Sequence, residues 1–213
     1  MSLSSPRVIA QSEKWLVIDK PSGWLVIPGR PARDAIEQSR PVLKEWAEKQ
    51  LGQALFVVHR IDLETSGVLV FARNEEAHRE ANGWFARHEV KKFYDLLAQG
   101  RGPRAPMARI AIPIEGAPSI TQLEVRERFG KGLAFLGRAR PLSGRRHQIR
   151  IHLAESGFPL LGDSRYHGPM QIGPIRIPRV ALHAAKLELP SGEIFESPWP
   201  EDFSAWVTEL REC

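Results

Sequence analysis

The apolar residues of this chain fall into short runs, most of them separated by turns that contain Gly or Pro. Short apolar runs enriched in β-branched and aromatic residues and bounded by turn residues are typical of strands. The predicted strands span residues 15–18, 24–27, 54–58, 68–72, 91–98, 108–114, 120–128, 133–139, 180–189 and 193–196. Many of them follow one another directly, which predicts an α+β fold with a mixed, mostly antiparallel central sheet flanked by helices and loops.

Helix signals lie between these runs. Ser39 is a predicted N-cap, and Gly52 is the predicted end of that helix. Further helices are predicted from the cap Asn74 to about residue 87, from residue 143 or 144 to residue 157, and from residues 200–202 onward. The 213 residues contain no linker and no internal repeat, so we expect a single domain that spans residues 1–213.

The composition restricts the class of protein. Cys213 is the only cysteine, so no internal disulfide can form, and we expect a cytoplasmic protein. No signal-peptide core is present near the start, and no window approaches ~20 apolar residues, so we expect no membrane association. The formal net charge of +5 favours a polyanionic partner. We also expect a monomer.

One charged stretch, His59–Gly67, lies between two of the predicted buried strands. Its sequence, His-Arg-Ile-Asp-Leu-Glu-Thr-Ser-Gly, places a histidine, an arginine and two carboxylates next to the core. Clustered titratable groups in such a position need partners and are candidate functional groups. The alternative is a plain loop ion pair between Arg60 and Asp62.

A second candidate segment is strongly basic. It carries five arginines within thirteen residues, namely Arg138, Arg140, Arg145, Arg146 and Arg150. Because the guanidinium fork matches phosphate oxygens, this density favours a phosphate-rich ligand. The alternative, a solvated helix face, fits less well because Ile149 and Leu153 direct one face of the predicted helix to the core. Helical periodicity would place Arg146 and Arg150 on one face.

Metal and nucleotide cofactors are not indicated. His147 and His152 are five residues apart, whereas a helical zinc pair needs a spacing of about four with an adjacent Glu. Neither a Walker-type loop nor a Gly-x-Gly-x-x-Gly loop occurs. Ser66 is close to His59 in sequence, but the Gly-x-Ser-x-Gly elbow of serine hydrolases is missing. We therefore expect neither a metal nor a cofactor.

Tyr94 is one of only two tyrosines, and its position in a predicted strand allows two interpretations. Its ring could lie in the core of the sheet, as strand tyrosines commonly do. Alternatively, the ring could stack on a nucleic-acid base.

Three ordered segments resemble the RluA-type pseudouridine synthase family. His59–Gly67 resembles the family's His-Arg-Leu-Asp-x-x-Thr-Ser-Gly signature, and Lys92-Phe93-Tyr94 resembles its Lys-x-Tyr strand. Residues 144–152 resemble its Gly-Arg-x-His-Gln-Ile-Arg-x-His segment. Asp19-Lys20-Pro21-Ser22-Gly23 and residues 181–184 also fall where that family has similar runs, so the resemblance covers about residues 15 to 195.

Two departures accompany this resemblance. The family often has Gly-Asp-x-x-Tyr-Gly, whereas residues 162–168 carry one more residue before the last glycine. Many members also have an N-terminal S4-type RNA-binding domain, for which this chain starts too late. We therefore expect RNA binding to rest on the catalytic domain and its basic loops.

The resemblance implies an RNA pseudouridine synthase that acts on a uridine in structured rRNA or tRNA without a cofactor. By resemblance, Asp62 is the catalytic aspartate and Arg150 is its basic partner, which would favour an ionised carboxylate. Tyr94 would stack on the flipped uracil, and Arg60 would enter the RNA stack that the base has left. The remaining expected RNA-binding residues are His59, Arg145, Arg146 and Leu182, the last as an apolar floor.

Two alternatives stay open. An RNA-binding or RNA-chaperone module could retain the fold without catalysis, which the basic charge alone would also support. A hydrolase that uses Ser66 and His59 is the more distant alternative. The path by which Asp62 would act, whether on the base, on the sugar or through a glycal, is also left open.

Overall fold

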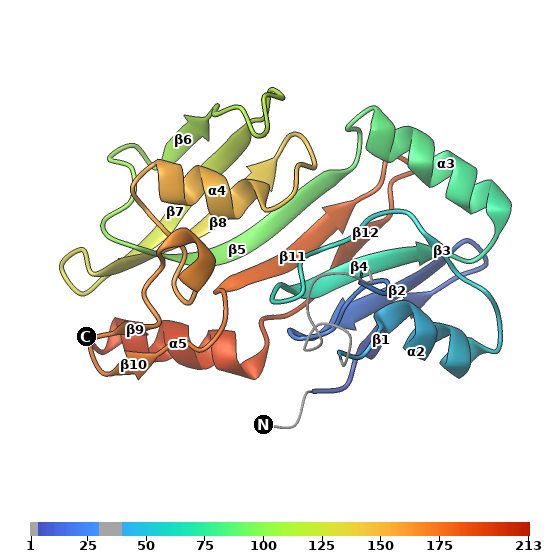
Figure 1. Ribbon diagram of the computed structural model, residues 1–213, viewed down its shortest axis with the longest axis horizontal. Helices are drawn as coiled ribbons and strands as arrows, with labels where there is room; N and C mark the ends of the chain where they lie inside the picture. Colours follow the sequence, from blue (N-terminus) through green and yellow to red (C-terminus); the bar gives the residue numbers. More distant parts are fainter. Residues whose placement is uncertain (1–3, 30–39) are drawn as a thin grey trace. The chain divides into compact units, whose positions relative to one another are not determined.

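The computed structural model describes residues 4–29 and 40–213, which divide into two compact units. The first unit comprises the chain up to Val90 together with Lys186–Ser197, and the second comprises Lys91–Ala185 and Pro198–Cys213. Strands, helices and antiparallel pairing confirm the predicted α+β class with a mostly antiparallel sheet (Figure 1). The expectation of a single domain stays a prediction.

The first unit is built on antiparallel strands. Strand β2 (Trp15–Lys20) pairs on one side with β1 (Arg7–Gln11) and on the other with β4 (Ser66–Ala72), which also pairs with β3 (Phe56–Val57). The helices of this unit are α2 (Leu43–Leu51) and α3 (Glu75–Ala86). Every residue of β4 is buried. Residues 58–65, which we call the Asp62 loop, lead into β4, so the strand that follows this loop is anchored in the core.

The second unit contains a four-strand antiparallel array in the order β5-β8-β7-β6. Its strands are β5 (Lys91–Gln99), β6 (Met107–Ile110), β7 (Thr121–Phe129) and β8 (Ala134–Pro141). The remaining elements are α4 (Gln148–Glu155), the short 3-10 helix η1 (Ser164–Tyr166), β9 (Gln171–Ile172), β10 (Ile175–Arg176) and α5 (Glu201–Arg211). Strand β11 (Leu182–Glu188) begins in this unit and ends in the first, where it pairs with β12 (Ile194–Glu196).

Alternation along the strands gives the second unit two apolar layers. Leu96 of β5 belongs to a cluster with Ile149 and Leu153 of α4, whereas Leu97 belongs to a cluster with residues of α5. Successive strand residues point to opposite faces, so α4 and α5 cover opposite faces of β5. Tyr94 is two residues from Leu96 and packs against the same cluster as α4.

Most element signals in the sequence are confirmed. The Asn74 side chain accepts a hydrogen bond from the Ala77 backbone N–H at 2.9 Å and caps α3. Gly52 ends α2 in a left-handed conformation with φ of 65°. The predicted cap Ser39 lies outside the described residues, and α2 begins later than predicted, at Leu43 after Val42. Pro200 precedes α5, as expected.

Three predictions about elements were wrong. Residues 24–27 form no strand, because only Leu25 makes an isolated bridge, to Val42. Strand β1 was missed, since its apolar run, Val8–Ala10, is short and lies between the polar residues Arg7 and Gln11. The helix expected from residue 143 begins only at Gln148, because His147 adopts a left-handed conformation with φ of 54°.

Candidate active site

The Asp62 loop connects β3 to β4 in the first unit and is held by backbone hydrogen bonds. The Thr65 N–H donates to the Asp62 carbonyl at 3.1 Å, which closes a tight turn. The Gly23 N–H donates to the Leu63 carbonyl at 2.8 Å and ties the loop to the turn after β2. The Asp62 side chain is partly exposed, and that of Arg60 is exposed. The loop therefore presents a carboxylate from a fixed backbone.

The buried side chain of Lys20 also stabilises the backbone of the Asp62 loop. Its side chain is fully buried, and its Nζ donates to the carbonyls of Pro21, Trp24 and Leu63 at 3.1, 2.9 and 3.1 Å. A buried ammonium is tolerated only where such acceptors replace water. One lysine therefore joins the turn after β2 to the residue that follows Asp62.

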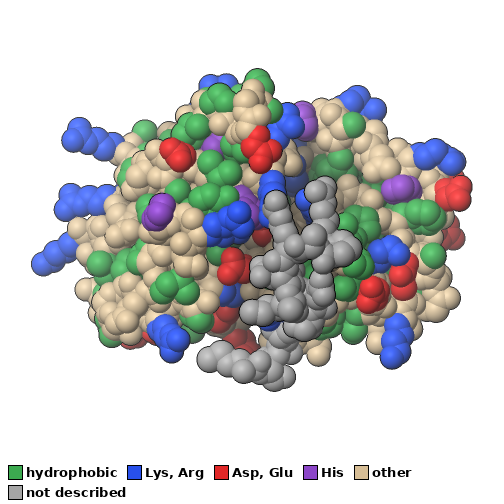
Figure 2. Space-filling model, viewed as in Figure 1, with side chains coloured by type: hydrophobic (Ala, Val, Ile, Leu, Met, Phe, Trp, Pro, Cys, Tyr) green, Lys and Arg blue, Asp and Glu red, His purple; other side chains and the backbone are tan. Residues whose placement is uncertain are grey.

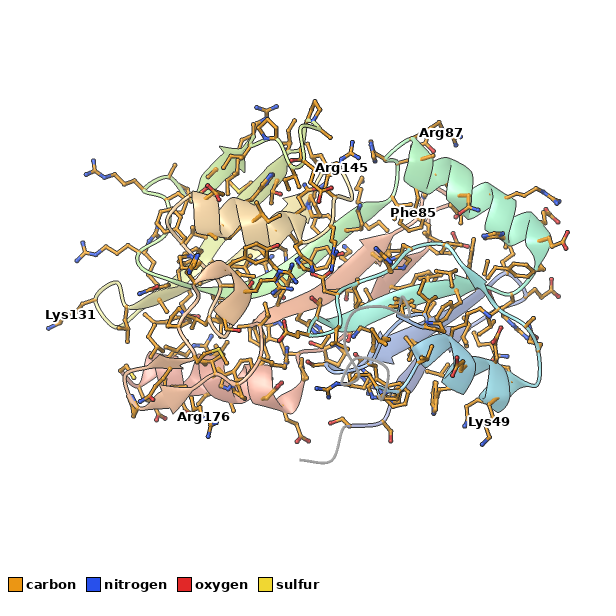
Figure 3. The ribbon with its side chains drawn as sticks, viewed as in Figure 1. Lys49, Phe85, Arg87, Lys131, Arg145 and Arg176 are labelled. Carbon is orange, nitrogen blue, oxygen red and sulfur yellow. The ribbon has the colours of Figure 1, made fainter. Side chains whose placement is uncertain are left out.

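His59 also holds the backbone of this loop. Its Nε2 accepts a hydrogen bond from the Val70 N–H of β4 at 3.0 Å. The ring stacks on Phe85 of α3, with centroids 5.0 Å apart and an interplanar angle of 17° (Phe85 is labelled in Figure 3). These contacts give His59 a role in shaping the loop, and its expected contact with RNA stays a prediction.

Ser66, the nucleophile of the hydrolase alternative, lies at the start of β4 and is only 1% exposed. A nucleophile must reach its substrate. Burial of Ser66 therefore weighs against the hydrolase alternative.

Tyr94 and Leu182 both belong to the apolar layer that includes α4 in the second unit. Leu182 is buried in the cluster that includes α4, and Tyr94 packs against that cluster while remaining partly exposed. A tyrosine with one part in the core and another accessible can offer its ring to a ligand. The stacking role of Tyr94 and the role of Leu182 as an apolar floor stay predictions.

Arg150 has a carboxylate partner that the sequence interpretation did not identify. Its Nε and Nη2 donate to the two oxygens of Asp163, each at 2.7 Å. Both side chains are buried, 5% and 1% exposed. The guanidinium also lies over the Tyr166 ring, 5.2 Å from its centroid. The expected pairing of Arg150 with Asp62 stays a prediction.

The segment Ser143–His147 forms a loop before α4, which we call the arginine loop because it carries Arg145 and Arg146. Both side chains are exposed, and Figure 3 shows Arg145 between β8 and α4. The prediction that Arg146 and Arg150 share a helical face was wrong, since Arg146 precedes the helix.

Two side chains fix the arginine loop. The Gln148 Oε1 accepts from the Ser143 hydroxyl at 2.7 Å and from the Arg145 N–H at 3.1 Å, and its Nε2 donates to the Ile120 carbonyl at 2.9 Å. Lys92 Nζ donates to the Ser143 carbonyl at 3.0 Å, and burial lowers the pKa of this ammonium. The loop can therefore present two cations from a rigid base.

The other arginines of the basic segment have structural partners. Arg138 makes a two-pronged ion pair with the buried Asp95, through hydrogen bonds of 2.6 and 2.8 Å. Arg140 lies over the Phe93 ring, 5.9 Å from its centroid. The sequence analysis did not separate these arginines from Arg145 and Arg146. The signal that could have done so is strand alternation, since residues 138 and 140 share a face of β8 with Leu136.

Neither histidine of the basic segment has the surroundings of a metal ligand. His152 is fully buried and contacts Thr121 Oγ1 at 2.8 Å and Ser119 Oγ at 3.1 Å. Among residues 4–29 and 40–213, no group of three or more His, Cys, Asp or Glu side chains could hold a metal ion. Within the same residues, no helix is long and apolar enough to cross a membrane.

Basic side chains are abundant on the surface. Figure 2 shows Lys and Arg side chains projecting on the side where Figure 3 labels Lys131, which lies in the turn between β7 and β8. Exposed cations of this kind attract polyanions at long range.

Comparison with known proteins links these features to a family. A family model described as RNA pseudouridylate synthase matches residues 14–155. Ribosomal large subunit pseudouridine synthase D of Pseudomonas aeruginosa is 31% identical over 232 residues, covering 96% of this chain and 72% of that protein. Dual-specificity RNA pseudouridine synthase RluA of Escherichia coli O6:H1 is 32% identical over 197 residues, covering 85% of each protein.

This chain spans 65% and 60% of the lengths of two further relatives, of the D and C types. The fold also resembles a solved structure, that of human RNA Pseudouridylate Synthase Domain Containing 4. The TM-score is 0.76 at 23% identity, covering 96% of this chain and 92% of that one.

Proposed function

Because this chain belongs to the RNA pseudouridylate synthase family, we propose that it isomerises a specific uridine to pseudouridine in a structured segment of rRNA or tRNA. The observation that carries the proposal is the extent of the family match. Residues 14–155 include the Asp62 loop, the Tyr94 strand and Arg150 of α4. All three expected catalytic residues therefore lie in the matched segment.

The chemistry places definite demands on the chain. The N1–C1′ bond of uridine breaks, the uracil turns, a C5–C1′ bond forms, the hydrogen on C5 leaves as a proton, and N1 takes up a proton. Nothing is oxidised or reduced overall, so the reaction needs no redox cofactor. It does require a carboxylate at the sugar and base, and we assign this role to Asp62. The rigid turn that carries Asp62 supports this assignment, because orientation lowers the barrier.

The uridine must leave the RNA stack to reach Asp62. Flipping a base costs a few kcal/mol, and contacts with the vacated stack and the flanking phosphates can offset this cost. We assign Arg60 to the stack and the exposed Arg145 and Arg146 to phosphates. Tyr94 would stack on the flipped uracil above Leu182. Arg150 would be the basic partner of Asp62.

The names of the relatives support an RNA target that includes ribosomal RNA. One is named for the large ribosomal subunit and another for dual specificity on RNA. A loop in structured RNA is consistent with this class, because its bases are easily unstacked. A monomer in the cytoplasm remains our expectation for the working enzyme.

Release of tritium from uridine labelled at C5 tests the proposal. The substrate is total RNA from a strain that lacks this protein. We expect release with the wild type and none above background with Asp62→Asn, which preserves the shape of the side chain. Glu64→Gln, in the same loop, is the matched control and should retain activity. Absence of release by the wild type, or equal release by Asp62→Asn, would refute the proposal.

The same strain distinguishes the alternative, an RNA-binding module without catalysis. That alternative predicts full complementation by Asp62→Asn and an unchanged pseudouridine map of total RNA. The proposal predicts at least one site that disappears on deletion and returns only with an active protein.

A further inference from the structure

The surroundings of Arg150 contain more fixed contacts than a simple ion pair needs. Asp163 binds one edge of the guanidinium, through Nε and Nη2. The Tyr166 ring lies against the guanidinium, with 5.2 Å between the Arg150 Cζ and the ring centroid. Two groups from one short segment therefore restrict both the rotation and the tilt of this side chain.

Tyr166 is itself held in place. Its hydroxyl lies 2.8 Å from His147 Nδ1, and the two rings meet at 84° with centroids 5.7 Å apart. His147 precedes α4, so the ring of Tyr166 is braced against the start of the helix that carries Arg150. The Tyr166 N–H also donates to Asp163 Oδ1 at 3.3 Å, which joins the two contacts of Arg150 to each other.

The backbone of residues 160–168 is built tightly around this arrangement. The Gly168 N–H donates to the Asp163 carbonyl at 2.8 Å, and a Cβ on Gly168 would lie 1.8 Å from the Leu160 carbonyl oxygen. His167 takes a left-handed conformation with φ of 63° after η1. The additional residue that separates this segment from the family pattern is thus accommodated in a sharp turn.

These contacts hold one edge and one face of the guanidinium. The direction in which its other edge points is therefore fixed. Such preorganisation is effective in catalysis because the group does not have to reorient during the reaction. A stabilising ion pair alone would not need the aromatic ring or its brace at His147.

We propose that Asp163 and Tyr166 are positioning residues that set the orientation of the Arg150 guanidinium for catalysis. The inference rests on the proposed function, since it presupposes that Arg150 takes part in the reaction. Asp163 acts through the charge and direction of its two hydrogen bonds, and Tyr166 acts through its ring.

Three variants test these roles by single-turnover tritium release from C5-labelled total RNA. Asp163→Asn retains one acceptor but loses the charge, and we expect the rate at saturating enzyme to fall about 100-fold, the cost of a misplacement of ~1 Å. Half-saturating concentrations should change less than about threefold. Tyr166→Leu should lose about tenfold, whereas Tyr166→Phe, which keeps the ring, should stay within about threefold of wild type.

The chain offers a matched control at Arg179. This arginine also makes a two-pronged pair with a carboxylate, Asp202, at 2.6 and 2.7 Å, and it lies 5.1 Å from the centroid of the Trp206 ring. Asp202 is 43% exposed, so its pair is a surface version of the same arrangement. Asp202→Asn should leave both the rate and the half-saturating concentration unchanged.

A double-mutant cycle separates positioning from folding. In an Arg150→Lys background, which lacks the forked guanidinium, Asp163→Asn should reduce the rate less than threefold further. Asp163→Glu keeps the negative charge on a side chain that is one methylene longer. We expect its rate to lie between those of Asp163→Asn and the wild type. Circular dichroism and thermal melting identify any variant that fails to fold. If the Asp163 variants do not fold, the comparison of the rates of Tyr166→Leu and Tyr166→Phe tests the proposal.

The results distinguish this inference from the proposed function. If the wild type releases no tritium, the proposed function fails. If the wild type is active and folded Asp163→Asn keeps its rate, or the rate effects of Asp163→Asn and Arg150→Lys are fully additive, the positioning role is wrong. If Tyr166→Phe loses as much as Tyr166→Leu, the assignment to the ring is wrong.

Discussion

Replacement of Lys20 by Met is the sharpest test of how the candidate active site is supported. Met keeps most of the volume of the side chain but removes the ammonium. The carbonyls of Pro21, Trp24 and Leu63 would then lose a donor that now lies within 3.1 Å of each. An unsatisfied buried polar group costs about 1–3 kcal/mol.

The lower end of this range applies to Lys20→Met. The residues that carry the three carbonyls are only partly buried, so water can reach some of them. The Leu63 carbonyl keeps its hydrogen bond from the Gly23 N–H, so the carbonyls of Pro21 and Trp24, at about 1 kcal/mol each, predict a loss of ~2 kcal/mol in the free energy of unfolding. This is a large fraction of the stability of an ordinary domain.

Urea unfolding followed by tryptophan fluorescence measures this loss. Lys44→Met is the matched control, because Lys44 pairs with Glu48 one helical turn away and both side chains are partly exposed. That change should cost at most about 0.5 kcal/mol. Hydrogen exchange adds a local measurement, since the amides of Gly23 and Thr65 should exchange faster in Lys20→Met. A loss below about 1 kcal/mol, or unchanged exchange at both amides, would refute the reasoning.

Three further predictions concern other parts of the chain. Gly168→Ala should destabilise the protein by more than about 2 kcal/mol in urea, since its Cβ would lie 1.8 Å from a backbone oxygen, whereas Gly173→Ala, with open space around it, should cost about 1 kcal/mol or less. Burial lowers the pKa of His152 below its ordinary value of 6.5, so the unfolded chain takes up its proton first as pH falls. The stability that neutral His152 contributes should be present above pH 6.5 and lost below it, and His152→Gln should flatten that part of the curve of unfolding free energy against pH. Arg145→Gln should reduce the slope of log affinity for RNA against log salt by about 1, whereas Arg176→Gln, at another exposed arginine, should not change it.

Much of the fold follows from local patterns in the sequence. Asn74 begins α3 and Gly52 ends α2 as their residue types predict, because capping is settled within about one turn of the chain. The apolar runs become strands for a similar reason, since alternation and β-branching act on neighbouring residues. The missed strand β1 has only a short apolar run and no clear alternation, and it forms by pairing with β2.

The candidate site also contains features that the sequence predicted and features that it did not. The resemblance of three motifs to the family identified Asp62, Tyr94 and Arg150 as candidates, because each of these motifs is continuous in sequence. The left-handed conformation of His147 was not predictable from its residue type. It moves the start of α4 to Gln148, whose side chain then fixes the arginine loop through contacts with β7 and Ser143.

The sequence by itself determined the class of fold, the family and the candidate chemical groups, since each is recorded in local composition and spacing. Only the tertiary structure decided which arginines are held by carboxylates and which are presented to solvent. Arg138 and Arg150 are held by Asp95 and Asp163, which lie 43 and 13 residues away along the chain. Partners at such separations are selected by strand register and loop closure, and neither can be read from the types of the paired residues.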